Sequence, residues 1–433
     1  MPIIDIHPPK TALMPDDGED TLKRSDRDCI TVPFSGDSGP GTLSKRVGIT
    51  LETVVFKRVD GLELGADIYY PALARGALLI HGGSHFLLTR REVPMKHVKT
   101  LLKRGFLPVS VDFRLCPELP LAAGGVPDVI DALSWVRKTL PHIQRARPDV
   151  QLDGTQVMVR GVSPEPHQPL VFANPTFPYI KYYTSDYRKF LEQQLTNIPL
   201  FPQAAGWSSG GQLAMIMGFL AAEKGIKPPE VIVSFYGMCD LESAWWRTPL
   251  QINWAMPYSE DDLLAGVEDK PTAGVSPERV AGVVRNPIAD NPRGRFAIHV
   301  FLKAQMVPIL VNGLPTRAKA RDLRRAGDET DYMAMPEPPV EAVRAISPYA
   351  QMLVGHYHIP TFFAHGDNDK EVPVDQSRDA SAALRASNIE TGCTVARGAG
   401  HSFDFRPEED PLHTGWAAAQ EAYDWAQRFI DTE

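Results

Sequence analysis

The sequence predicts an α/β protein whose central sheet is mostly parallel and flanked by helices. Short, continuous apolar runs at residues 77–80 and 231–236 are typical of strands that are buried on both faces. Residues 128–140 and 416–430 instead carry their apolar side chains at the spacing of a helix that covers a sheet. Because such runs alternate along the chain, a parallel sheet with helical connections is favoured.

Composition excludes several classes of protein. The 433 residues are 43% hydrophobic and 23% charged, which predicts a soluble globular protein with a large core. The net charge of −8 argues against a nucleic-acid or anionic-membrane partner. No apolar run reaches 18 residues and no signal peptide precedes the acidic N-terminal stretch, so we expect no membrane span and a cytosolic location. The cysteines lack C-x-x-C spacing, which predicts neither a disulfide framework nor a metal site.

The first third of the chain contains most of the recognisable elements. Residues 1–47 lack a sustained period and are predicted to be a mobile leader, after which the first part of the core runs over residues 48–236. Asp60-Gly61 is a strong turn signal and predicts a hairpin between two flanking strands. The elements expected up to this point are strands at 53–59, 62–70, 77–80, 107–113 and 151–158 and helices at 91–104 and 128–140.

Ser208 lies in a G-x-S-x-G pattern, Gly206-Trp207-Ser208-Ser209-Gly210. This pattern is typical of a nucleophile elbow, a sharp strand-to-helix turn that projects a serine hydroxyl from the sheet. Residues 212–222 have the composition of a helix, so the N–H groups after Ser208 would lie at a helix N-terminus, where negative charge is favoured. Ser208 is therefore a candidate nucleophile.

Residues 159–203 interrupt the approach to this elbow. They are rich in proline and tyrosine, and residues 195–203 are what a branch point, a pyrimidine-rich tract and a terminal CAG would encode if translated. Removing the segment would join the strand at 151–158 directly to the elbow. Our hypothesis is a retained intron in a gene model, and the alternative is a surface excursion that acts as a lid.

The second half supplies partners for the serine. A strand over residues 361–364 is followed by H-G-x-x-D-x-x-V-P, in which Asp369 is the candidate acid and Asp367 its nearby rival. His401 lies in a G-x-x-H-x-F loop and is the candidate base. The chain order serine, aspartate, histidine is that of one known arrangement of the triad. Residues 237–347, rich in Trp, Pro, Met and Arg, are predicted to form a cap, and residues 348–433 the second part of the core.

The motif His81-Gly82-Gly83 follows a predicted strand, and R-L-C-P-E follows the next one at residues 114–118. Together with G-W-S-S-G-G, these motifs resemble the hormone-sensitive-lipase branch of the α/β-hydrolases, although Ser84 replaces the usual third glycine. The resemblance implies an α/β-hydrolase fold with an oxyanion hole built from the N–H groups of Gly82, Gly83 and Ser209. It also implies that Asp112, Arg114 and Glu118 form a structural ion-pair network behind the oxyanion loop.

Within that superfamily, the motifs and residues 262–267 are similar to fungal esterases and thioesterases of secondary metabolism, including releasing domains of polyketide synthases. The resemblance implies a serine hydrolase that cleaves a small-molecule ester, lactone or thioester through Ser208, Asp369 and His401, without cofactor or metal. An acyl thioester bound to a carrier protein is one substrate form. The alternatives are an acyltransferase with the same triad and a catalytically dead binding scaffold. The oligomeric state is not readable from the sequence.

Overall fold

The computed structural model describes nine stretches of the chain, and the account below concerns these alone. They are residues 27–31, 50–70, 74–142, 152–162, 208–250, 259–274, 291–325, 335–405 and 415–429.

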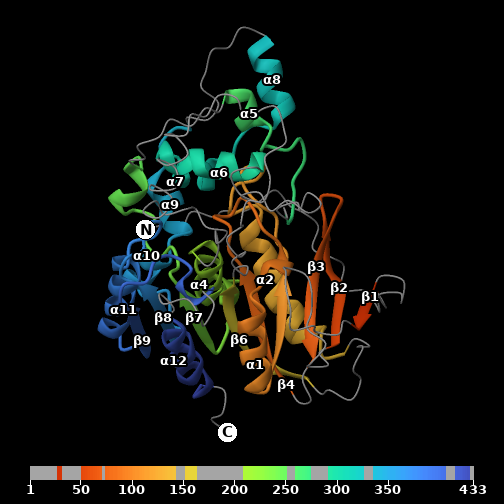
Figure 1. The fold of residues 1–433 in the computed structure, drawn as a ribbon, viewed down its shortest axis with the longest axis vertical. Coiled ribbons are helices and arrows are strands. Elements are labelled where there is room, and N and C mark those ends of the chain that lie inside the picture. The colour runs from red at the N-terminus through yellow and green to blue at the C-terminus, as the bar shows by residue number, and fades with distance from the viewer. Residues whose placement is uncertain are drawn as a thin grey trace, which may run out of the picture.

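A nine-stranded sheet forms the centre of the described chain, in the order β1-β2-β3-β5-β4-β6-β7-β8-β9 (Figure 1). Pairing is antiparallel from β1 through β3 to β5, and parallel from β5 onward. The parallel strands β4, β5, β7 and β8 are apolar and buried, as expected of strands covered on both faces. The strands are β1 (Arg27–Thr31), β2 (Thr50–Val59), β3 (Leu62–Tyr70), β4 (Ala74–His81), β5 (Phe106–Val111), β6 (Leu152–Val162), β7 (Val231–Phe235), β8 (Thr361–Gly366) and β9 (Thr391–Ala396).

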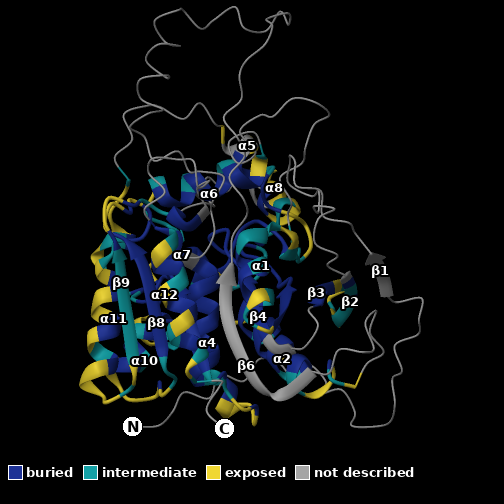
Figure 2. Ribbon diagram, turned by 60° about the horizontal axis from the view of Figure 1, so that its bottom comes forward, coloured by how far each residue is buried: buried dark blue, intermediate teal, exposed yellow. Residues whose placement is uncertain are grey.

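Helices cover both faces of this sheet, and the alternation of side chains along β4 shows which helix lies where. Leu78 and Ile80 pack in the same core as the buried residues of α2 (Gly125–Lys138), α4 (Ser208–Glu223) and α11 (Asp375–Ala386). Ala77 and Leu79 point to the opposite face, where α1 (Met95–Lys103) and α12 (Trp416–Gln427) pack. Figure 2 shows the buried strands between helices whose outer sides are exposed. The predicted fold class is confirmed.

The described part of residues 237–347 consists of short helices grouped at one end of the sheet (Figure 1). Arg293, in the first turn of α6, bonds to loops that follow β4 and β5, so these helices lie at the carboxyl end of the parallel strands. We keep the assignment of this region as a cap as a proposal. The elements are η3 (Ala244–Arg247), α5 (Glu260–Leu264), α6 (Pro292–Leu302), α7 (Met306–Asn312), α8 (Arg317–Arg325) and α9 (Val340–Ala345); α10 (Pro348–Leu353) follows.

Most of the predicted elements are confirmed within one to four residues. The hairpin of β2 and β3 turns at Asp60 and Gly61, whose φ angles of 53° and 76° are both positive, as the tight hairpin turn requires. The predicted helix over 91–104 is shorter, because Pro94 separates α1 from a single turn, η2 (Arg90–Glu92). Residues around 296–310 form two helices, α6 and α7, which bend by 117°.

Two boundary predictions need correction. The predicted leader contains β1, which pairs with β2 through backbone hydrogen bonds, and an edge strand needs no amphipathic period for such pairing. Strand β6 runs past residue 158 to Val162 and pairs with β4 and β7, so its first four residues beyond 158 belong to the sheet. The rest of the interruption, residues 163–203, lies outside the described residues. Its origin stays a hypothesis.

No single helix among the described residues is long and apolar enough to cross a membrane. The bent pair of α6 and α7 passes the length and composition test only when the two are taken together.

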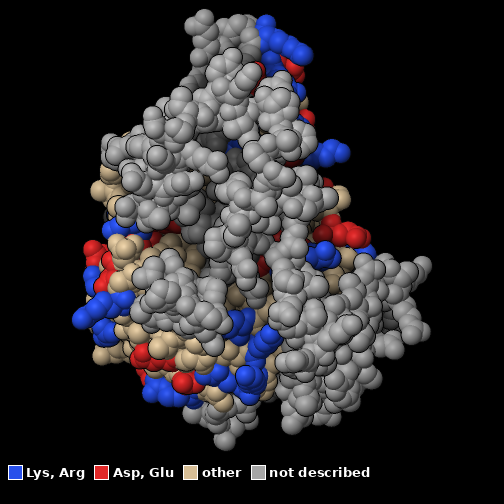
Figure 3. Space-filling model, in the orientation of Figure 1, with Lys and Arg blue, Asp and Glu red and all other residues tan. Residues whose placement is uncertain are grey.

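On the face shown in Figure 3, described Lys and Arg side chains are interspersed with Asp and Glu. Helix α8, with the sequence RAKARDLRR, is the most basic of the described helices and lies at one tip of the molecule. Two of its arginines are partly neutralised by acidic neighbours, since Arg317 pairs with Glu268 and Arg325 with Asp322.

Candidate active site

Asp369 and His401 lie in direct contact although 32 residues separate them. Asp369 follows β8 and His401 follows β9, and the two strands are parallel neighbours, so the loops at their carboxyl ends meet. His401 Nδ1 lies 2.6 Å from Asp369 Oδ2, and both side chains are almost completely buried. This is the geometry in which a carboxylate orients an imidazole and selects its tautomer.

The loop after β8 holds the Asp369 carboxylate ionised. The backbone N–H groups of Glu371 and Val372 donate to Oδ1 at 2.8 and 3.0 Å, and His365 Nε2 lies 3.1 Å from Oδ2. Burial by itself raises the pKa of this carboxyl, but the charge of His401 and the hydrogen bonds from both histidines outweigh burial. The pKa of Asp369 is therefore held well below its usual range.

His365 is a positioning residue that the sequence prediction did not assign. Its Nδ1 lies 2.7 Å from Ser377 Oγ on α11, and its Nε2 also lies 2.9 Å from the carbonyl oxygen of Val372. The ring thus links β8, the Asp369 loop and α11. The signal was present, because His365 is the first residue of the H-G-x-x-D motif that pointed to Asp369.

The rival carboxylate, Asp367, faces a different partner. Its Oδ1 accepts a hydrogen bond of 2.6 Å from the backbone N–H of Gly398, and the residue is exposed. It therefore supports the turn that leads to His401, whereas the carboxylate that contacts the imidazole is that of Asp369. The geometry favours Asp369 over Asp367 as the partner of His401.

The Nε2 nitrogen of His401 is the one that does not contact Asp369. Among the described residues, His401 Nε2 is buried and has no hydrogen-bond partner. Glu371 Oε2 approaches it to 3.6 Å, and Tyr236 packs its ring 4.5 Å from the imidazole centroid. Burial lowers the pKa of His401, but Asp369 and then Glu371 oppose it and raise this pKa to about 9.

Ser208 is the first residue of α4, and its side chain lies outside what the structure describes. The start of α4 is nevertheless located by the close packing of Gly210 against the end of β4. A Cβ on Gly210 would lie 2.3 Å from the carbonyl oxygen of Ile80 and 2.7 Å from that of His81, so only glycine allows α4 to approach the end of β4 this closely. The second glycine of the predicted elbow therefore has the role that the motif assigns to it.

The predicted oxyanion loop is a compact turn after β4. Gly83 has a φ of 97°, and a Cβ there would lie 2.0 Å from the carbonyl oxygen of Leu87. His85 Nε2 lies 3.0 Å from Gln212 Oε1 on α4, and Gln212 donates in turn to the carbonyl oxygen of Ile346. The loop and the N-terminal turn of α4 are thus tied together, which brings Gly82, Gly83 and Ser209 to one region.

The three charged residues that follow this loop in sequence do not form one network, and this corrects the prediction. Asp112 pairs with Arg90, Arg114 pairs with Asp128 and Asp60, and Glu118 pairs with Arg293. The prediction joined residues that are near in sequence, whereas the sheet and α6 place each beside a partner from elsewhere in the chain. Each pair anchors a different part of the loop region.

Arg293 joins α6 to the loops around the site. Its Nε donates to the carbonyl oxygen of Phe86 at 2.6 Å, and its Nη atoms donate to both oxygens of Glu118 and to the carbonyl oxygens of Gly266 and Cys116. All five N–H donors of the guanidinium are therefore used. The side chains of Arg293 and Glu118 are 3% and 1% exposed, so removing either one would leave the other as an unpaired buried charge.

We expect Glu118→Leu to lower the free energy of unfolding by about 3–5 kcal/mol, because it leaves the buried Arg293 guanidinium unpaired. Denaturant unfolding measures this loss. The double variant with Arg293→Met should lose clearly less than the sum of the two single variants, since it removes both charges. As a control, Glu63→Leu breaks the exposed pair with Arg58 and should change stability little. Additive losses would show that the pair is not coupled.

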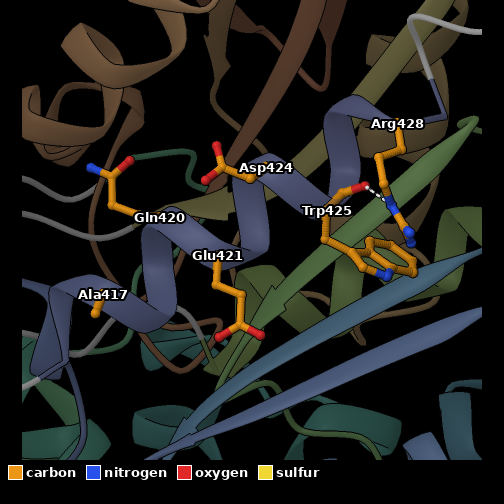
Figure 4. A pocket seen from close by; sticks show the side chains of 6 residues that line it. All are labelled: Ala417, Gln420, Glu421, Asp424, Trp425 and Arg428. Atoms are coloured by element: carbon orange, nitrogen blue, oxygen red, sulfur yellow. Dashed lines mark hydrogen bonds between the residues drawn. The ribbon is translucent and has the colours of Figure 1, made fainter.

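Two concavities of the described chain are lined by none of the candidate site residues. An open groove follows the outer side of α12 (Figure 4), and none of its lining residues is a candidate site residue: Ala417, Gln420, Glu421, Asp424, Trp425 and Arg428. A small hollow next to η3 is lined by Trp245, Trp246, Phe301 and Met306 among others. Within the described stretches, no group of three or more His, Cys, Asp or Glu side chains is placed to hold a metal ion.

The chain order of the elements now decides the fold. An oxyanion-type loop follows β4, a glycine-dependent helix start at Ser208 abuts it, an acid follows β8 and a histidine follows β9. The chain has the α/β-hydrolase fold. The candidate site residues lie at the carboxyl ends of the parallel strands, after β4, β8 and β9 and at the start of α4, whereas the antiparallel strands β1 to β3 extend the sheet at the opposite edge from β9.

The chain is similar to part of several fungal synthases, among them proteins named as non-reducing polyketide synthases. It is 36% identical over 401 residues to methylphloroacetophenone synthase of Cladonia uncialis and 33% identical over 430 residues to 5-methylorsellinic acid synthase of Aspergillus terreus. These matches cover 90% and 95% of the chain but only 14% and 15% of the synthases, so the chain spans about one seventh of their length. No protein-family model matches the sequence.

Two of the similar solved structures are named as a hydrolase and an esterase, both at low sequence identity. One is an α/β-hydrolase superfamily protein of Enterococcus faecalis, with a TM-score of 0.48 and 14% identity over 84% of this chain and 96% of that one. Another is a thermophilic esterase of Thermogutta terrifontis, with a TM-score of 0.43 and 16% identity over 88% of this chain and 91% of that one.

Proposed function

We propose that this chain is a serine hydrolase that cleaves a carboxylic ester, lactone or thioester through an acyl-enzyme on Ser208. The observation that carries the proposal is the buried contact of 2.6 Å between His401 and Asp369, with the opposite nitrogen of His401 unpartnered among the described residues. An imidazole held in this way can accept a proton at Nε2. The N-terminus of α4, where Ser208 lies, supplies the nucleophile in this proposal.

The reaction has two steps. His401 Nε2 takes the hydroxyl proton of Ser208 as the oxygen attacks the carbonyl carbon, and then delivers that proton to the leaving alcohol or thiol. The N–H groups of Gly82, Gly83 and Ser209 hold the oxyanion. Water next gives its proton to His401 and attacks the acyl-enzyme, and the returning proton releases Ser208 and a carboxylic acid. No organic cofactor takes part in this scheme.

The similarity to polyketide synthases supports a polyketide-type acyl substrate, free or held as a thioester on a carrier protein. The two relatives named above match almost the whole chain, and a further relative, from Penicillium roqueforti, is named a non-reducing polyketide synthase. An acyltransferase, in which an alcohol or amine replaces water, uses the same residues. A rise in the rate of acyl release when an alcohol or amine acceptor is added would favour transfer over hydrolysis.

The direct test is labelling by a fluorophosphonate, because that reagent modifies only an activated serine. We expect one modified peptide, with the phosphonyl group on Ser208 as located by mass spectrometry. We also expect turnover of aryl ester and thioester substrates by the same preparation. An unlabelled but folded protein would favour the catalytically dead scaffold.

The pH dependence follows from the surroundings of His401. Because Asp369 and Glu371 raise the pKa of His401 to about 9, the imidazole is protonated and cannot act as a base at neutral pH. We therefore expect kcat/KM to rise with pH through about 9 and to fall about tenfold per unit below it. A pH profile with an aryl ester measures this limb. An acidic limb near the ordinary histidine value, about 6.5, would contradict the expected environment.

A further inference from the structure

We propose that Glu371 is a positioning residue that holds the protonated form of His401 from the Nε2 side. Through this contact it sets how readily Ser208 can be activated. The inference rests on the proposed function, because it concerns the nitrogen that would receive the serine proton. Neither the triad pattern nor the comparisons assign a role to this side chain.

Glu371 is held in the site by its backbone, and its carboxylate approaches His401. Its backbone N–H donates to Asp369 Oδ1 at 2.8 Å, and its carbonyl oxygen accepts a hydrogen bond of 3.1 Å from Trp245 Nε1. With the backbone fixed, its buried carboxylate reaches to 3.6 Å from His401 Nε2. One loop therefore places a carboxylate at each ring nitrogen, Asp369 at Nδ1 and Glu371 at Nε2.

The imidazole has few other polar neighbours among the described residues. From the loop after β8 come Asp369 and Glu371, and behind Asp369 lies His365. From the His401 loop itself comes Asp404, whose carboxylate adds to the raised pKa of His401 and accepts a hydrogen bond of 2.6 Å from Tyr236 Oη. Among the described carboxylates, Glu371 is the one that lies next to Nε2, at 3.6 Å.

Glu371 and Ser208 therefore compete for the Nε2 nitrogen of His401. A protonated Nε2 carries a hydrogen that Glu371 attracts, whereas catalysis needs a neutral Nε2 that accepts the hydroxyl hydrogen of Ser208. Burial raises the pKa of Glu371 to about 7, so above that pH its carboxylate is ionised and favours the imidazolium. Glu371 and His401 titrate as a coupled pair. The neutral imidazole, which is the base, forms only when the pair loses its second proton.

Replacing the carboxylate by an amide tests this directly. In Glu371→Gln the attraction for the imidazolium is lost, so His401 gives up its proton at lower pH. We expect the acidic limb of fluorophosphonate labelling to move down by about one pH unit, which is about tenfold faster labelling below the wild-type limb. Labelling rates well above the limb should be equal. The reagent reports on free enzyme and needs no knowledge of the natural substrate.

Asp375→Asn is the matched control, because it removes the same charge from an exposed position at the start of α11 and should leave the limb in place. If Glu371→Gln does not fold, Glu371→Asp withdraws the carboxylate from Nε2 and should move the limb in the same direction by a smaller amount. An unmoved limb in a folded variant, or labelling slowed equally at every pH, would overturn the inference. If Ser208→Ala is labelled as fast as wild type, the proposed function itself fails.

Discussion

Ser208→Ala is expected to lower kcat on an aryl ester by about 10⁴-fold or more, because no other group can form the acyl-enzyme. The change removes one oxygen atom at the start of α4 and leaves the helix otherwise unaltered. Substrate binding should persist, so KM should change far less than kcat. The residual rate comes from oxyanion stabilisation and binding alone.

Steady-state kinetics with a chromogenic ester measures this loss, and fluorophosphonate labelling should disappear in parallel. Ser387→Ala makes the same chemical change at an exposed position after α11 and should retain full activity. Equal activity of Ser208→Ala and wild type would show that the elbow motif does not carry the nucleophile.

Asp369→Asn is expected to lower kcat by about 10⁴-fold while the protein stays folded. An amide at this position cannot accept the Nδ1 hydrogen as a carboxylate does, so the ring adopts the wrong tautomer or turns away. The effect should be large because Asp369 Oδ2 contacts His401 Nδ1 at 2.6 Å in a buried setting. The pKa of His401 should fall as well, since its main source of negative charge is gone.

The control is Asp367→Asn, which changes the rival carboxylate two residues earlier. Asp367 supports the turn at Gly398, so a moderate effect is expected, well short of the loss in Asp369→Asn. Kinetics and circular dichroism on both variants separate the two roles. A larger loss in Asp367→Asn would reverse the assignment of the acid.

Much of the fold could be predicted because it depends on local pattern. Parallel strands such as β7 are buried on both faces, so neither face carries polar side chains and the sequence is a continuous apolar run. The turn at Asp60 and Gly61 depends on residues that tolerate positive φ. Conversely, β1 was missed because an edge strand is held by backbone hydrogen bonds, which leave no trace in the pattern of side chains.

The site was predictable in part for a similar reason. Gly83 and Gly210 leave a signal because close backbone contacts exclude every other residue, and Asp369 and His401 each follow a strand within a recognisable motif. The partners of the charged residues were not predictable. Arg293 and Glu118 are 175 residues apart, and only the docking of α6 onto the loops after β4 and β5 brings them together.

By itself, the sequence determined the class of the fold, the order of the motifs and the candidate triad, because each depends on residues that are close along the chain. Only the tertiary structure decided which aspartate faces His401 and which group faces its other nitrogen. The loop after β8 presents Asp367, Asp369 and Glu371 within five residues, and although the motif favours Asp369, sequence spacing does not determine which way each carboxylate points. Their directions are set by hydrogen bonds of this turn to His365 at the end of β8 and to Trp245 and Gly398, which come from two other parts of the chain.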